Sequence, residues 1–114
     1  MLNLNSTILT QVVNSAKRSA ATDQRWLNAI ARAAEELESN PYIARQDDHL
    51  LIGSPSGQIY EANGACQCTA YLVGQPCWHR AAARLVKRHD EAQQRQQARP
   101  AYEKAVADLM ECFA

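Results

Sequence analysis

The chain has 114 residues, in which twelve lysines and arginines balance twelve aspartates and glutamates. This length is typical of a single domain, and the zero formal net charge excludes a strong overall attraction to nucleic acid or to an anionic membrane. The sequence has no signal-like start and no apolar run of bilayer length, so we expect a soluble, cytoplasmic protein without a membrane partner.

The first predicted elements are two amphipathic helices. Ser6 or Thr7 is expected to cap the first, whose apolar side chains recur at helical spacing. Thr22 or Asp23 begins the second, and Asn40-Pro41 ends it. Short helices of this kind are marginally stable alone, so we expect them to pack on each other or on a sheet.

The hydrophobic period changes after the second helix. Residues 42–45 are compatible with an extended segment, and 49–52 and 58–62 are short runs with β-branched or aromatic residues. Between the last two runs, Ser54-Pro55-Ser56-Gly57 has proline second and glycine fourth, which suits a type I turn. We therefore predict a β-hairpin.

Helical patterns return near the end of the chain. A long helix is predicted from about Trp78 to Arg99, and Pro100 fits the first turn of a separate final helix. That final helix carries one apolar stripe, consisting of Tyr102, Ala105, Val106, Leu109, Met110 and Phe113.

Four potential metal ligands lie between the hairpin and the long helix: Cys66, Cys68, Cys77 and His79. Three sulfurs and one imidazole are the number and type of donors that close a tetrahedron around a structural zinc ion. Residues two apart on a strand point to the same side, so the first two cysteines can face one ion. The start of the following helix is expected to lower the pKa of the Cys77 thiol through its unpaired amide groups.

Other interpretations of these ligands are a labile disulfide pair, another thiophilic metal or coincidence. A catalytic zinc usually keeps an open coordination position, which a fourth ligand would fill. The deaminase signature needs a second cysteine at position 80, where this chain has Arg80. A Cys77–His79 nucleophile pair is disfavoured by the nearby cysteines. We therefore expect a structural zinc site and no enzymatic activity.

The Cys-x-Cys, loop, Cys-x-His order resembles the SWIM zinc finger family over residues 49–88. The resemblance includes a Leu- and Tyr-containing strand before the first pair, Gly74-Gln75-Pro76 before the second, and an alanine-rich helix after it. Thr69-Ala70-Tyr71 and Trp78 depart from the usual residues of the family, but none of them replaces one of the four ligands. We expect Trp78 to pack beneath the site rather than stack on a base.

The resemblance implies a zinc-stabilised β-β-α module of the kind that binds DNA or proteins, found within larger nucleic-acid-related proteins and in small proteins of bacteria and mobile elements. The predicted fold class is therefore α+β, with this SWIM-like module flanked by an N-terminal helical pair and a C-terminal helix. We expect one domain, 1–114, with a helical part at 1–41, the zinc module at 42–90 and a helical extension at 91–114.

Two functions follow from these predictions. In the first, the module binds nucleic acid through a basic helix face formed by Arg80, Arg84, Lys87 and Arg88, although such a face is also typical of a solvated helix. In the second, the protein is an adaptor or inhibitor that docks on a protein partner, encoded by a phage or another mobile element. The sequence leaves the partner open, and also the oligomeric state, with a dimer among the options.

Overall fold

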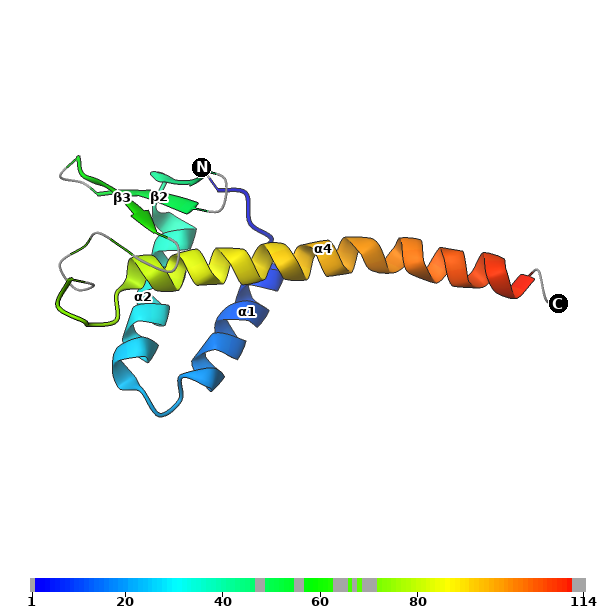
Figure 1. Cartoon of the computed structure of the whole chain (residues 1–114), viewed down its shortest axis with the longest axis horizontal. Coiled ribbons are helices and arrows are strands. Elements are labelled where there is room, and N and C mark those ends of the chain that lie inside the picture. Colours follow the sequence, from blue (N-terminus) through cyan, green and yellow to red (C-terminus); the bar gives the residue numbers. More distant parts are fainter. Residues whose placement is uncertain are drawn as a thin grey trace.

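The computed structural model describes residues 2–46, 49–54, 57–62, 66, 68 and 72–111, and for 99–102 it describes the backbone only. In these residues the chain is α+β, as predicted, with three helices and one three-stranded antiparallel sheet (Figure 1). The elements in chain order are α1 (Ser6–Ser19), α2 (Gln24–Ser39), β1 (Ile43–Gln46), β2 (His49–Gly53), β3 (Ile59–Ala62) and α4 (Trp78–Glu111).

Both N-terminal helices begin at a side-chain cap. The carboxylate of Asp23 accepts hydrogen bonds from the first turn of α2, which confirms one of the two predicted caps. The predicted cap of α1 is wrong, because Asn5 occupies that position and its Oδ1 accepts from Thr7 N at 3.0 Å and Ile8 N at 3.1 Å. Ser6 is therefore the first residue of helix α1 and not its cap.

The sheet has the order β1-β2-β3, and β2 pairs antiparallel with both neighbours. The predicted hairpin is therefore confirmed, and residues 42–45 largely coincide with β1. Gly57 N donates to Ser54 O at 3.0 Å, which closes the turn between β2 and β3. Gly57 has a φ of 87°, a conformation that glycine adopts without strain. Pro55 and Ser56 lie outside the described residues.

The first half of α4 lies between the sheet and the helical pair, so the fold has three layers (Figure 1). Leu85 is 1% exposed and contributes to an apolar core shared with α1, α2 and the sheet. The two inner sheet residues Ile43 and Ile52 lie opposite each other in the register and are equally buried. This common core joins the N-terminal helical part to the strands and the start of α4.

The predicted break at Pro100 is wrong, because α4 continues as one helix of 34 residues through this position. Proline removes one backbone donor, but its fixed φ is close to that of a helix and the flanking residues are good helix formers. The continuous helix gives the molecule its longest dimension, 63 Å. The side chain of Tyr102 and all of Phe113, both assigned to the apolar stripe, lie outside the described residues.

In the described part of the chain, no helix combines the length and the apolar character required to cross a bilayer.

Candidate metal centre

The four predicted ligands lie together at one end of the sheet. Their donor atoms are all within 4.8 Å of one another. Cys66 pairs with Ala62 of β3 through an isolated bridge, so the end of the hairpin positions the first sulfurs. Cys77 directly precedes α4, and His79 lies in the first turn of that helix. The cluster therefore joins the hairpin to α4. Its three sulfurs and one imidazole are close enough together to hold a metal ion.

The loop between the two ligand pairs returns the chain to α4. Gly74 has a φ of 76°, which explains why glycine suits this position in the loop. Leu72 N donates to Cys68 O at 3.2 Å, and Arg80 N lies 3.4 Å from the Cys77 sulfur. The loop and the first turn of α4 are thus both hydrogen-bonded to the cysteines.

The geometry and the burial of the donors fit a tetrahedral ion. Zinc–sulfur bonds of about 2.3 Å place the sulfurs of a tetrahedron about 3.8 Å apart, so the observed cluster needs an inward movement of no more than about 1 Å. Cys66, Cys68 and Cys77 are buried and are not joined by disulfide bonds. The buried Nδ1 of His79 has no hydrogen-bond partner among the described residues. Such an unpaired atom is costly unless it binds something, so Nδ1 is the atom through which His79 could hold an ion.

Burial is the largest cause of the pKa shifts of Cys66, Cys77 and His79 in the absence of a metal ion. It raises the pKa of the Cys66 thiol to about 12. It also raises the pKa of Cys77: the Arg80 amide at the helix start acts to lower this pKa, in the predicted direction, but burial outweighs it and the net shift is upward. Burial, followed by the positive charge of Arg32, lowers the pKa of His79. A cation among the sulfurs would replace the thiol protons and thereby relieve this penalty.

The imidazole of His79 is held between two aromatic rings. Its centroid lies 4.8 Å from that of Tyr60 on β3 and 4.2 Å from that of Trp78. Trp78 is half-buried and packs against the main core, as expected for a residue beneath the site. These contacts fix the plane of the ring, which is the requirement for presenting one nitrogen to an ion.

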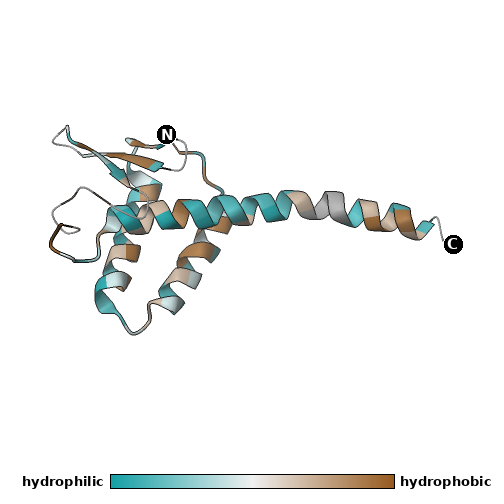
Figure 2. Ribbon diagram, viewed as in Figure 1, coloured by the Kyte–Doolittle hydropathy of each residue, from teal (hydrophilic) through white to brown (hydrophobic). Residues whose placement is uncertain are grey.

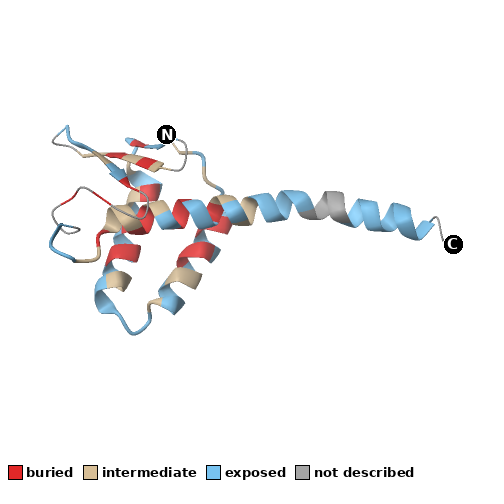
Figure 3. Cartoon of the chain, viewed as in Figure 1, coloured by how far each residue is buried: buried red, intermediate tan, exposed pale blue. Residues whose placement is uncertain are grey.

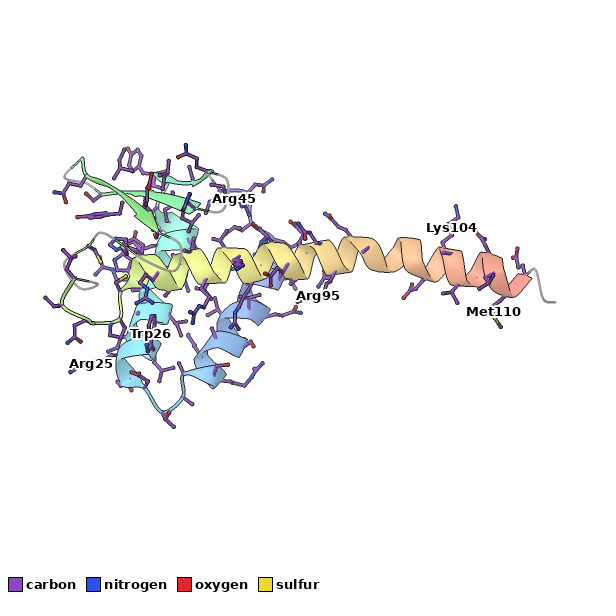
Figure 4. The ribbon with its side chains drawn as sticks, viewed as in Figure 1. Arg25, Trp26, Arg45, Arg95, Lys104 and Met110 are labelled. Carbon is purple, nitrogen blue, oxygen red and sulfur yellow. The ribbon has the colours of Figure 1, made fainter. Side chains whose placement is uncertain are left out.

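Helix α2 supports the site through contacts that the sequence analysis did not foresee. Two reciprocal cation–π pairs join it to the start of α4: Arg32 lies 5.6 Å from the Trp78 ring centre, and Arg80 lies 5.6 Å from that of Trp26. Arg25 also donates to Gln75 Oε1 in the ligand loop at 2.7 Å. Figure 4 shows Arg25 and Trp26 on α2 at this end of the molecule. The only sequence signal for these pairs is that each of the two helices contains one tryptophan and an arginine within six residues of it.

The predicted basic face is divided by the structure. Arg84, Lys87 and Arg88 are exposed on α4, and none of them forms an ion pair with another described residue. Arg80 is half-buried, and its guanidinium is engaged with Trp26. The exposed part of the face therefore consists of three residues beyond the first turn of the helix.

No protein-family model, curated protein or solved structure matches this chain. The likeness to the SWIM family therefore rests on the ligand order and its flanking residues.

Proposed function

We propose that Cys66, Cys68, Cys77 and His79 hold a structural zinc ion, and that the protein is a non-enzymatic, SWIM-type module that binds nucleic acid. The convergence of four buried or half-buried donors on one point supports the zinc site. Zinc is the commonest ion for three thiolates and one imidazole, and four protein ligands leave no position for a substrate. The ion would fasten the hairpin to α4 and so fix the orientation of the basic residues that follow.

Binding to nucleic acid is assigned to Arg84, Lys87 and Arg88. Their charges are exposed and are not neutralised by described acidic neighbours, so they are available for phosphates. The zero net charge of the chain means that attraction must be local to this face. Contacts of this kind fix the position of a backbone without reading sequence, and we expect binding to depend strongly on salt.

A gel-shift titration of the zinc-loaded protein against duplex and single-stranded DNA and RNA tests this proposal. Replacing Arg84, Lys87 and Arg88 with alanine should weaken binding and lower the slope of log affinity against log salt by about three for duplex DNA. The matched control removes three exposed positive charges elsewhere, at Lys17, Arg18 and Lys104. No binding at low salt, or an equal loss in the control, would exclude the basic face as the binding surface.

The second candidate function is an adaptor or inhibitor that docks on a protein, encoded by a phage or another mobile element. It is favoured by two residues between the ligand pairs, because Leu72 is 75% exposed and Val73 is 66% exposed. Adjacent exposed apolar residues on a loop held by a metal site are suited to insertion into a partner's pocket.

Affinity capture from the native host separates the two functions. A stoichiometric partner that survives nuclease, and is lost after chelation or after Leu72→Ser with Val73→Ser, would support the adaptor. Recovery of nucleic acid that depends on Arg84, Lys87 and Arg88 would support the first proposal. The loop variant should leave the metal content unchanged, because neither residue is a ligand.

A further inference from the structure

A groove between α1 and α4 lies further along α4 from the metal centre, and it has a volume of about 440 Å³. Its lining residues are Gln11, Val12 and Ser15 of α1 and Arg88, Glu91, Ala92 and Arg95 of α4. Most of these side chains are polar. Arg88 belongs both to this lining and to the basic face described above, so the two surfaces are continuous.

The groove carries a net positive charge. Arg88 and Arg95 are exposed, and neither forms an ion pair with another described residue. Glu91 is the one acidic residue in the lining, so it offsets one of the two positive charges. On the opposite side, the helix Ser6–Ser19 contains no acidic residue. An anionic ligand is therefore favoured at this place, although the net charge of the whole chain is zero.

Helix α1 adds uncharged polar groups to the groove. Gln11 is exposed and Ser15 is half-buried, and the side chain of neither forms a hydrogen bond with another described residue. Amide and hydroxyl side chains, together with arginine, are groups that commonly donate to the phosphate and sugar oxygens of nucleic acid. Both helices thus offer donors of the kind that holds a sugar-phosphate backbone.

Three arginines form a line on this side of α4. Arg84, Arg88 and Arg95 are four and seven residues apart, which places them within about 40° of one another around the helix. The line is about 16 Å long, which matches about five phosphates at the rise of about 3.4 Å per nucleotide in one strand. Figure 2 shows hydrophilic residues along the middle of α4, and Figure 4 shows Arg95 on the side of α4 toward α1.

The width of the groove favours one strand over a duplex. The axes of two packed helices lie about 8–10 Å apart, whereas the major groove of a duplex is by itself about 12 Å wide. Val12 is buried, and Ser15 and Ala92 are half-buried, between the two helices (Figure 3). A duplex would contact the exposed rim without reaching these residues, but a single strand is narrow enough to do so.

We infer that this groove binds the sugar-phosphate backbone of a single strand of DNA or RNA, so that the protein prefers single strands to duplex. The inference rests on the function proposed above, and it adds contacts with Gln11, Ser15 and Arg95. Arg84 and Arg88 hold phosphates at one end of the strand, and Arg95 holds a phosphate at the other. Contacts with the backbone alone make binding nearly independent of base sequence.

Fluorescence anisotropy of the zinc-loaded full chain tests the preference and the role of Arg95. The probes are labelled oligonucleotides of about ten nucleotides, single-stranded or duplex, with DNA and RNA in separate titrations. The native protein should bind the single strand about fivefold more tightly than the duplex, and Arg95→Gln should weaken single-strand binding about fivefold and lower the slope of log affinity against log salt by about 0.7. The matched control Lys104→Gln removes the same charge from the opposite side of α4 and should change neither (Figure 4).

Two further pairs of variants test whether the strand lies inside the groove. Ser15→Glu should weaken binding more than Asn14→Glu, which adds the same charge at an exposed neighbouring position outside the lining. Glu91→Gln should tighten binding, whereas Glu38→Gln on α2 should not, although both changes raise the net charge by one. Circular dichroism and metal content verify the fold of every variant.

The results separate the groove from the proposed function. Binding that depends on Arg84, Lys87 and Arg88, but in which each groove variant behaves like its control, would overturn the groove and leave the proposed function standing. Equal or tighter binding of the duplex would overturn the preference for a single strand. Absence of binding by the native protein at low salt, to each of the four probes, would overturn both proposals.

Discussion

The buried imidazole of His89 accepts a hydrogen bond from the backbone N–H of Asn5, with 2.9 Å between Asn5 N and His89 Nε2. The two residues are 84 positions apart, and Asn5 is also the cap of α1. Because Nε2 is the acceptor, Nδ1 carries the ring proton and donates to Asp90 Oδ1 at 3.0 Å. Asp90 in turn accepts two hydrogen bonds from Arg45 of β1, at 2.6 and 3.1 Å. One polar network thereby joins the N-terminus, α4 and the sheet.

Replacing His89 with leucine should destabilise the protein by about 1–3 kcal/mol, because the Asn5 amide loses its acceptor inside the structure. Glutamine at the same position should recover part of this loss, since its side-chain oxygen is an acceptor. Urea unfolding of the metal-loaded protein measures both. Lys87→Leu is the control on the exposed face of the same helix and should change the free energy of unfolding by less than about 0.5 kcal/mol. Equal effects of His89→Leu and Lys87→Leu would show that the network contributes nothing.

The Arg45–Asp90 pair predicts a small loss of stability in acid. Burial raises the pKa of Asp90, but hydrogen bonds from Arg45 and His89 outweigh it and hold the pKa below its ordinary value. A carboxyl group with a lowered folded-state pKa stabilises the protein above its unfolded pKa, near 4, and this contribution is lost as pH falls through the folded pKa. Both side chains are 36% exposed, so the effect should be about 0.2–1 kcal/mol. Asp90→Asn should flatten this part of the stability curve, measured by urea unfolding between about pH 6 and pH 3. An unchanged slope in the variant would contradict the assignment.

Removal of the proposed zinc ion should unfold the ligand loop and separate the hairpin from the start of α4. Structural zinc supplies on the order of 10 kcal/mol of apparent free energy in small domains, so chelation or Cys77→Ser should abolish a cooperative transition in this part of the chain. Metal analysis of purified protein, with hydrogen exchange before and after chelation, provides the measurement. Cys112→Ser is the control, because that cysteine is not one of the four ligands. Protein without metal, or unchanged exchange in 66–89 after chelation, would refute the site.

The cation–π pairs predict that α2 stabilises the candidate metal centre from outside the segment 49–88 that contains the four donors. A double-mutant cycle with Trp26→Leu and Arg80→Gln should give a coupling energy of about 0.5–1 kcal/mol, because each single change already removes the contact. The cycle combines unfolding free energies from urea titration. Trp26 with the exposed Arg84 is the matched control pair and should show additive effects. If the effects of Trp26→Leu and Arg80→Gln on the free energy of unfolding were additive, the contact between these two side chains would not stabilise the site.

Local sequence signals were sufficient for most element types. The cap at Asp23, the stop at Asn40-Pro41 and the β2–β3 hairpin follow from short-range propensities that the tertiary structure did not override. Pro100 was misjudged because its cost as a helix interior residue is finite, and good helix formers on both sides continue the helix. The cap at Asn5 was missed because Asn5, Ser6 and Thr7 can all cap a helix and they are consecutive. Only Asn5 also donates its backbone amide to His89, a contact that is too distant in sequence to be predicted.

By itself, the sequence determined the α+β class and which four potential metal donors cluster, because the spacing of donors along a strand and at a helix start is local geometry. The tertiary structure alone decided which atoms face those ligands: the rings around His79, the support from α2, and the burial that raises the thiol pKa values. It also showed that Arg80 is engaged with α2, whereas Arg84, Lys87 and Arg88 are exposed. Such contacts join residues tens of positions apart, and desolvation depends on everything packed around a group, so neither can be read from neighbouring residues in the chain.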